Sequence, residues 1–115
     1  MKKRKRAWLY CAIDAPEDNH NALKGQRQQL MNYAEQMNFE VVGSSSDAGH
    51  QPFLERSGFC EFIKQAKNGS VDILLLANLH CIGGTAMQLA QFEATTASLG
   101  IEVYSPMTGA MKSCQ

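Results

Sequence analysis

Hydrophobic residues in this chain fall into two patterns, which indicate two kinds of secondary structure. Short continuous apolar runs are typical of buried strands, whereas apolar residues that recur every three or four positions are typical of amphipathic helices. The strand pattern occurs at residues 7–13 (AWLYCAI), 39–43 (FEVVG), 71–77 (VDILLLA) and 101–104 (IEVY). The helix pattern occupies the intervals between them, at residues 21–37, between Ser57 and Asn68, and at residues 86–99.

Local signals support these helices. Thr85 and Gln88 have the spacing of a capping box, and Ser57 is a candidate N-cap. Typical helix stops follow at Asn38, at Asn68-Gly69 and at Gly100. The apolar faces are predicted to consist of Leu23, Leu30, Ala34 and Met37 in the first helix, and of Phe59, Phe62, Ile63 and Ala66 in the second.

Strands that alternate with helices predict right-handed crossovers and a parallel sheet covered on both faces. We therefore expect a three-layer α/β domain over residues 7–106, with a mainly parallel sheet of four strands, or five. Trp8 and Tyr10 share one face of the first strand and are expected to pack beneath a helix. Core or helix-packing positions are also expected for Met31, Met37, Met87 and Phe92.

Charged residues are distributed unevenly along the chain. Five of its eleven basic residues are Lys2, Lys3, Arg4, Lys5 and Arg6, which leaves six basic and eleven acidic residues in the remainder. Residues 1–6 are expected to form a disordered basic tail, which is either solvated or attracted to nucleic acid. Because no apolar run approaches the roughly 18 residues of a membrane span, a cytoplasmic protein without membrane contact is expected.

In parallel sheets, ligands bind beyond the carboxyl ends of the strands. That edge is predicted to gather polar residues from four strand ends. The polar loop from Ser44 to Leu54 follows the second predicted strand and begins with three serines and Asp47. The other three strand ends contribute Asp14, then Asn78, His80 and Cys81, and finally Ser105.

Several chemistries are poorly supported at this edge. The chain lacks the glycine-rich signatures of nucleotide sites, and Gly83-Gly84-Thr85 is a weak candidate for binding phosphate. Metal-ligand types occur without a recurring spacing, at Cys11, Asp14, His50, His80 and Cys81. We therefore expect no metal, no cofactor and no small-molecule substrate.

An ordered series of motifs resembles the catalytic domain of the serine recombinases, the resolvase/invertase family. The middle of the chain carries Asp47-x-Gly49, then Leu54-Glu55-Arg56-Ser57-Gly58, then Ala66-Lys67-Asn68-Gly69. Upstream, Leu23-x-x-Gln26-Arg27 resembles the family's S-L-x-x-Q-R helix start. Downstream, Gly100-Ile101-Glu102-Val103 resembles its G-[VI]-x-[LF] strand, so the likeness covers about residues 8–106.

The resemblance implies a serine nucleophile that attacks a DNA phosphodiester, with arginines that neutralise the phosphate. The family's Y-x-R-x-S stretch corresponds here to Tyr10-Cys11-Ala12-Ile13-Asp14, with Ala12 at the arginine position and Asp14 at the serine position. Its L-D-R-L-[SGA]-R stretch corresponds to residues 79–84. There, His80 replaces the aspartate, and Cys81 and Gly84 replace the arginines.

Gln26 and Arg56 match the family's active-site neighbourhood, and Arg56 is expected to pair with an acidic neighbour such as Asp47. The sequence therefore predicts a catalytically inactive resolvase-like domain of a mobile-element protein, which associates with itself or with a full-length recombinase. The alternatives are a divergent serine recombinase, with Ser44, Ser45 or Ser46 as substitute nucleophile, and a DNA-binding regulator that uses the basic tail. DNA contact is expected to be weak.

The resemblance also implies a long helix and a helix-turn-helix domain beyond the catalytic domain. Residues 107–115 are expected to be a C-terminal tail or the truncated start of that long helix. Phosphate neutralisation dominates DNA affinity. Because those DNA-binding parts are not expected here and the chain after residue 6 is acidic, protein–protein association is favoured over DNA binding.

Overall fold

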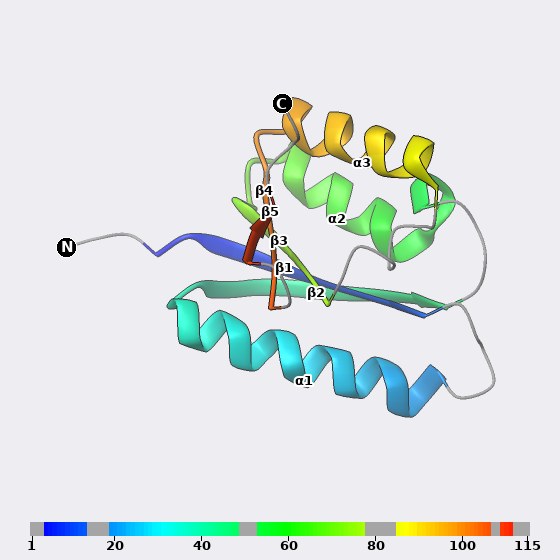
Figure 1. The fold of residues 1–115 in the computed structure, drawn as a ribbon. Helices are drawn as coiled ribbons and strands as arrows, with labels where there is room; N and C mark the ends of the chain where they lie inside the picture. The colour runs from blue at the N-terminus through cyan, green and yellow to red at the C-terminus, as the bar shows by residue number, and fades with distance from the viewer. Residues whose placement is uncertain (1–3, 14–18, 49–52, 78–84, 107–108, 112–115) are drawn as a thin grey trace.

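The computed structural model describes residues 4–13, 19–48, 53–77, 85–106 and 109–111 (Figure 1). Strands and helices alternate along most of the chain, as the hydrophobic pattern predicts. The elements are β1 (Arg6–Ile13), α1 (Asn19–Met37), β2 (Glu40–Ala48), the 3-10 turn η1 (Phe53–Glu55), α2 (Ser57–Lys67), β3 (Ile73–Leu76), α3 (Ala86–Ser98), β4 (Glu102–Ser105) and β5 (Gly109–Met111).

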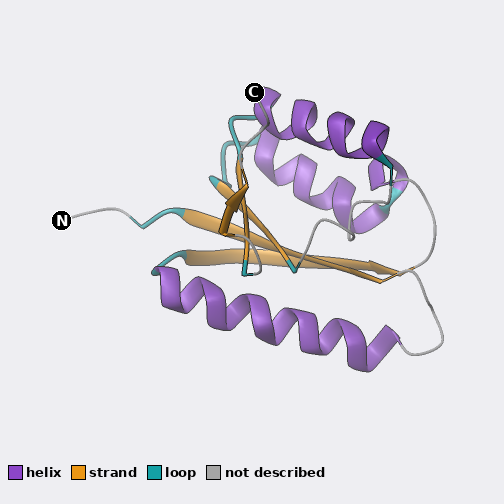
Figure 2. Ribbon diagram, viewed as in Figure 1, coloured by secondary structure: helices purple, strands orange, loops and turns teal. Residues whose placement is uncertain are grey.

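The strands form one sheet in the order β2-β1-β3-β4-β5. The first four are parallel, and β5 pairs with β4 in the antiparallel direction. Helix α1 covers one face of the sheet, and α2 and α3 lie together on the other (Figure 2). The predicted three-layer α/β fold is therefore confirmed, with the fifth strand present.

The core has two halves, separated by the sheet. Because successive strand residues point to opposite faces, β1 contributes to both. Trp8 and Tyr10 pack with Phe59 and Phe92 beneath α2 and α3, as predicted. On the other face, Leu9 packs against α1. The α1 half of the core consists of Ala7, Leu9, Cys11, Leu30, Ala34, Phe39, Ile73 and Leu75.

Each helix ends in a left-handed residue, as the stop signals predict. Asn38 has a φ of 63°, Gly69 of 75° and Gly100 of 71°. After α1, the N–H of Phe39 donates to the carbonyl of Ala34 and the N–H of Asn38 donates to that of Glu35, the two bonds of a Schellman motif. These sharp ends return the chain directly into the next strand.

Strand β2 is longer than the sequence pattern predicts. The segment expected to begin a polar loop at Ser44 continues the strand, and residues 44–47 pair with residues 9–12 of β1. The pairing shifts register between Ala7 and Trp8, where Val42 is the additional β2 residue. Beyond this bulge, the Ser45 hydroxyl lies between Trp8 and α2. It forms hydrogen bonds with both, so this polar side chain is accommodated within the sheet.

Three other expectations are wrong. Ser57 is the first residue of α2, and the N-cap position is held by Arg56, whose side chain makes no cap hydrogen bond. Met37 and Met87 are 40% and 72% exposed, so neither is the core or helix-packing residue that was expected. The capping box of Thr85 and Gln88 is confirmed, with the N–H of Gln88 donating to the Thr85 hydroxyl at 3.0 Å.

The basic segment is partly built into the fold, contrary to the expected disorder through residue 6. Arg6 is the first residue of β1, and its guanidinium donates to both carboxylate oxygens of Asp72 at 3.1 Å. Lys5 pairs with Glu102 at 2.7 Å, and Arg4 donates to the carbonyl of Phe39. In the described part of the chain, no helix is long and apolar enough to span a membrane.

Candidate functional site

The carboxyl ends of β1 and β2 meet the start of α2 at a hydrogen-bonded group of residues, which we call the Asp47 cluster: Tyr10, Asp47, Arg56, Ser57 and Gly58. The Asp47 carboxylate accepts from the backbone N–H of Gly58 at 3.0 Å and from the Tyr10 hydroxyl at 2.8 Å. The Ser57 hydroxyl lies 3.4 Å from the same carboxylate.

Asp47 supplies the capping hydrogen bonds that Arg56, at the N-cap position of α2, does not make, although Asp47 belongs to a different element. Its two oxygens accept from the N–H groups of Gly58 and Phe59, which have no partner within the helix. A carboxylate at this end also interacts favourably with the helix dipole. Because these N–H groups already bind Asp47, this helix terminus does not offer them to a phosphate.

Gly58 allows this close approach of strand and helix. A Cβ atom at residue 58 would lie 2.6 Å from Asp47 Oδ2 and 2.7 Å from the carbonyl oxygen of Ser46. Ser45 adds a second connection, since its hydroxyl donates to the Gly58 carbonyl at 2.7 Å and accepts from Trp8 Nε1 at 3.0 Å. Ser45 therefore ties β1, β2 and α2 together.

Arg56 contacts the cluster through Tyr10. Its Nη1 donates to the Tyr10 hydroxyl at 3.4 Å, and that hydroxyl donates in turn to Asp47. Arg56 was expected to pair with an acidic neighbour such as Asp47, but the contact seen between the two side chains runs through the Tyr10 hydroxyl and is not a direct ion pair. Tyr10 is fully buried, and this burial raises the pKa of its phenol, while Arg56 acts in the opposite direction. The phenol stays neutral and donates a hydrogen bond to the carboxylate.

Gln26 holds the end of β1 from the other face of the sheet. Its Nε2 donates to the carbonyl of Ala12 at 2.9 Å, and its Oε1 accepts from the N–H of Ala12 at 3.1 Å. The Gln26 amide thus satisfies both backbone groups of Ala12, where the family resemblance expects an arginine. The structure therefore brings Ala12 and Gln26 together and places Arg56 on the α2 side of the sheet.

The remaining predicted edge residues divide into two groups. Ser105 is buried and donates to the carbonyl of Ala77 at 2.9 Å, and Ser44 accepts from Arg27. Both hydroxyls form hydrogen bonds within the protein and so contribute to its folded structure. Asp14, His50, Asn78 to Gly84, and Lys2 and Lys3 lie outside the described residues. In the described portion of the chain, no three His, Cys, Asp or Glu residues gather as metal ligands would.

The sequence pattern does not predict the contact between Asp47 and the start of α2. The residues that make it are Asp47 and, ten and eleven positions later, Ser57-Gly58, but their pattern predicts a loop followed by a helix with its own N-cap. Chemically, the cluster presents one cation, Arg56, beside a carboxylate that is already satisfied. That arrangement can hold an anion at a single point and contains no activated nucleophile among the described residues.

The fold resembles solved structures of recombinase domains. The C-terminal catalytic domain of ISC1926 TnpA, an IS607-like serine recombinase, aligns with a TM-score of 0.77 and 22% identity, over 87% of this chain and 68% of that one. The N-terminal catalytic domain of TP901-1 integrase aligns with a TM-score of 0.76 and 21% identity, over 91% and 79%.

A resolvase family site-specific recombinase from Streptococcus pneumoniae gives a TM-score of 0.77 at 18% identity, over 92% of this chain and 74% of that one. No curated protein sequence matches the chain significantly. The sequence itself matches the family model described as "Resolvase, N terminal domain" over residues 15–113. Because this match spans most of the chain and agrees with the fold, the protein belongs to the resolvase N-terminal domain family.

Proposed function

We propose that this resolvase-family domain does not cleave DNA and acts by associating with a second copy of itself or with a full-length recombinase. The end of β1 carries the proposal. Ala12 stands at the arginine position of the family's Y-x-R-x-S stretch, its methyl group is buried, and its backbone is bound by Gln26. Alanine supplies no positive charge to a phosphodiester, and loss of one transition-state donor typically costs about 10²–10³ in rate.

The residues that follow support the same proposal. Asp14 stands at the serine position, where a carboxylate would repel a phosphate rather than attack it through a hydroxyl. Ser45, one of the three substitute nucleophiles, already donates to Gly58 and accepts from Trp8. Ser44 accepts from Arg27 at 3.4 Å. Neither hydroxyl has a neighbouring general base among these contacts.

One observation favours the opposite function, a divergent serine recombinase. Arg56 is held by the Tyr10 hydroxyl at the carboxyl end of the sheet, which is the edge where parallel sheets bind ligands. If Arg56 neutralised a scissile phosphate there, its replacement by alanine would abolish cleavage. The Arg56→Ala variant is therefore the control that distinguishes a divergent recombinase from a domain that does not cleave DNA.

DNA association is proposed to be weak and secondary. Arg4, Lys5 and Arg6 bind acceptors within the fold, and the pairs of Lys5 with Glu102 and Arg6 with Asp72 neutralise part of their charge. Lys2 and Lys3 supply the rest of the proposed DNA contact. Such contact depends on phosphate neutralisation and is expected to fall steeply with salt.

Cleavage is tested by incubating the full chain with a pool of random-sequence duplexes and separating covalent protein–DNA adducts under denaturing conditions. The pool removes the need to know a target site. We expect no adduct above the level given by the Arg56→Ala variant. An adduct formed by the unaltered chain and lost in that variant would overturn the proposal and establish the divergent recombinase.

A further inference from the structure

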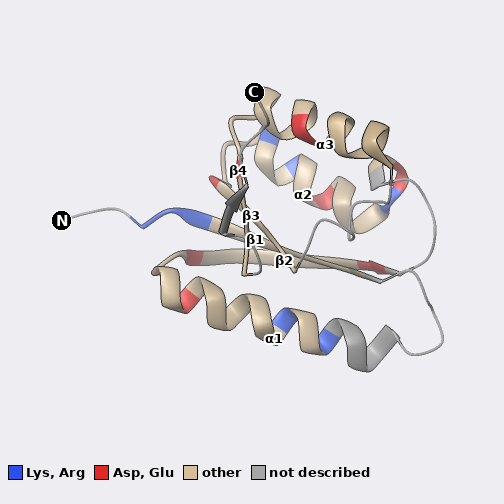
Figure 3. Cartoon of the chain, viewed as in Figure 1, with Lys and Arg blue, Asp and Glu red and all other residues tan. Residues whose placement is uncertain are grey.

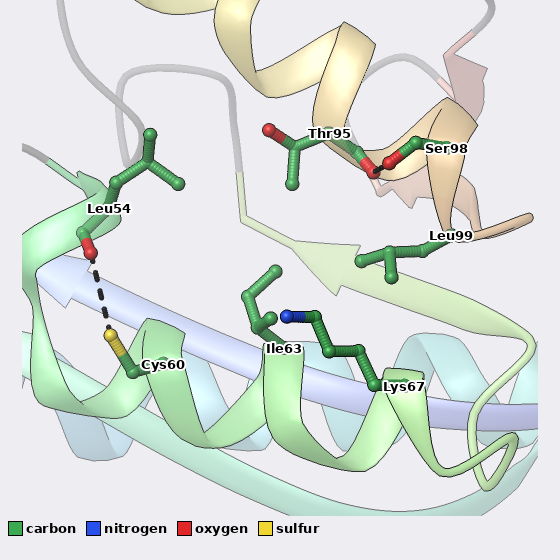
Figure 4. Close-up of a pocket in the computed structure, with 7 residues that line it drawn as sticks. All are labelled: Leu54, Cys60, Ile63, Lys67, Thr95, Ser98 and Leu99. Atoms are coloured by element: carbon green, nitrogen blue, oxygen red, sulfur yellow. Dashed lines mark hydrogen bonds between the residues drawn. The ribbon is translucent and has the colours of Figure 1, made fainter.

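A pocket of about 300 Å³ lies between α2, α3 and the 3-10 turn η1 (Figure 4). This volume is at the lower end of the roughly 300–1,000 Å³ that is typical of sites for small ligands. None of the residues that line it belongs to the Asp47 cluster, so the pocket is a separate feature of the molecule. The lining residues are Leu54, Cys60, Ile63, Lys67, Thr95, Ser98 and Leu99.

The walls of the pocket are mainly aliphatic. Ile63 and Leu99 are half-buried and pack against the core, and Leu54 is 47% exposed. None of the described lining residues is aromatic. Because removal of apolar surface from water is the main favourable term in binding to such walls, an occupant is expected to have an aliphatic body.

Three of the polar lining side chains use their hydrogens within the protein. The Thr95 hydroxyl donates to the carbonyl of Gln91 at 2.8 Å, and the Ser98 hydroxyl donates to that of Thr95 at 2.8 Å. The Cys60 thiol donates to the Leu54 carbonyl at 3.4 Å. These groups therefore offer a ligand acceptor atoms and no free donor.

Lys67 is the one charged residue in the lining. In the part of the chain that the structure describes, no carboxylate forms an ion pair with its ammonium group, whereas Lys5 and Arg6 both have such partners. The one charged residue of α3 is Glu93, and it does not line the pocket (Figure 3). An ammonium group has three donors and a single positive charge, which matches one carboxylate.

The pocket has a polar end and a distance that limits the length of a ligand. Lys67 and Cys60 lie seven positions apart on α2, which is about 10 Å along the helix axis. Figure 4 shows the Lys67 side chain reaching toward Ile63, which lies between these two positions. An extended chain advances about 1.2 Å per bond, so a carboxylate at Lys67 with about eight carbons reaches Cys60. A phosphate monoester carries nearly two negative charges, which one ammonium group does not balance.

We propose that the pocket between α2 and α3 binds an aliphatic monocarboxylate of medium chain length. The carboxylate binds the Lys67 ammonium group, and the tail lies over Ile63 toward Cys60 and Leu54. The inference goes beyond the proposed function and does not rest on it, because no residue of the Asp47 cluster or of the end of β1 takes part.

The test uses octanoate as the probe, titrated into the full isotope-labelled chain and followed by amide chemical shifts. We expect saturable shifts at the lining residues of α2 and α3, with half-saturation at roughly millimolar octanoate. Lys67→Gln should weaken octanoate binding about fivefold, and 1-octanol, which has the same tail without the charge, should bind the unaltered chain about fivefold more weakly. Lys64→Gln is the matched control, because it removes the same charge from the last turn of α2 outside the pocket lining, and it should leave the affinity unchanged.

The exposed Cys60 thiol reports where the tail lies. Its alkylation by iodoacetamide is measured by mass spectrometry of the peptide that contains it, and saturating octanoate should slow this reaction severalfold in the unaltered chain and in Lys64→Gln. The inference is overturned if octanoate causes no saturable shifts at the lining residues, if Lys67→Gln or 1-octanol binds as tightly as the unaltered pair, or if saturating octanoate leaves the alkylation of Cys60 unchanged.

Discussion

The carboxylate of Asp47 and the backbone N–H of Gly58 join strand β2 to the start of helix α2 through a hydrogen bond of 3.0 Å. The two residues are eleven positions apart and belong to different elements. Their contact explains why both residue types are needed. The aspartate supplies acceptors that the helix terminus lacks, and the glycine leaves room for the carboxylate to reach them.

Replacement of Asp47 by alanine should destabilise the domain by about 2–3 kcal/mol. The change removes the capping hydrogen bonds of α2 and leaves the buried Tyr10 hydroxyl without the carboxylate that accepts its hydrogen bond. Urea unfolding, followed by circular dichroism, measures the free energy of unfolding. Glu40→Ala, which removes an exposed carboxylate from the same strand, is the control and should change that free energy by less than about 0.5 kcal/mol. Equal losses in both variants would contradict the capping role.

Two glycine substitutions should have opposite signs. Gly25 lies within α1, and a Cβ there would meet nothing within 4 Å, so Gly25→Ala should stabilise the protein by about 0.5–1 kcal/mol through helix propensity. Gly58→Ala gains the same propensity but forces its Cβ against Asp47 and Ser46, and a net loss of about 1–3 kcal/mol is expected. Thermal unfolding of the two variants checks this. If both variants were stabilised, the end of β2 would have to move away from residue 58 at little cost in free energy.

The sequence predicted the architecture because the signals for it are local. The face of Phe59, Phe62 and Ala66 is fixed by helical spacing, and all three are buried against the sheet. The capping box at Thr85 depends on residues three positions apart. Helix stops such as Gly100 are similarly short-range.

The candidate site was less predictable because its contacts are long-range. The pattern predicts a loop at Ser45, because three consecutive serines do not form an apolar run, and its partner Trp8 lies 37 residues away. The pattern also predicts that Asp47 pairs with Arg56, whereas its oxygens accept from the start of α2 and from Tyr10. The resemblance singles out Gln26 and Arg56, which contact Ala12 and Tyr10 in the structure, and their functional role stays a prediction. The roles predicted for Asp14 and His80 stay predictions, because these positions lie outside the described residues.

Gln26→Ala should destabilise the end of β1 by about 1–2 kcal/mol. The substitution removes the two hydrogen bonds that the Gln26 amide makes to the part-buried backbone of Ala12. Gln28→Ala is the matched control, because Gln28 lies on the same helix and bonds only to the exposed Asn32 side chain among the contacts seen. Amide hydrogen exchange at Ala12 gives a local readout. Faster exchange is expected in the first variant and unchanged exchange in the second, and equal protection in both would contradict the role assigned to Gln26.

Tyr10→Phe should change the response of stability to alkaline pH. Burial raises the pKa of the Tyr10 phenol above its ordinary value of 10.0, so the folded state holds the proton more tightly than the unfolded state. The resulting stability is fully present below pH 10 and is lost as the pH rises above it, by at most about 1.4 kcal/mol per pH unit. The unaltered chain should therefore lose stability relative to Tyr10→Phe above pH 10, although at neutral pH it is the more stable of the two by about 1 kcal/mol.

Urea unfolding of both proteins at pH 8, 10 and 11 measures this difference. The two proteins differ only at residue 10, so the contributions of all other residues cancel in the comparison. A difference that stays constant across this range would mean that the phenol ionises equally well in the folded and unfolded states, and that the buried hydrogen bond to Asp47 does not retain its proton.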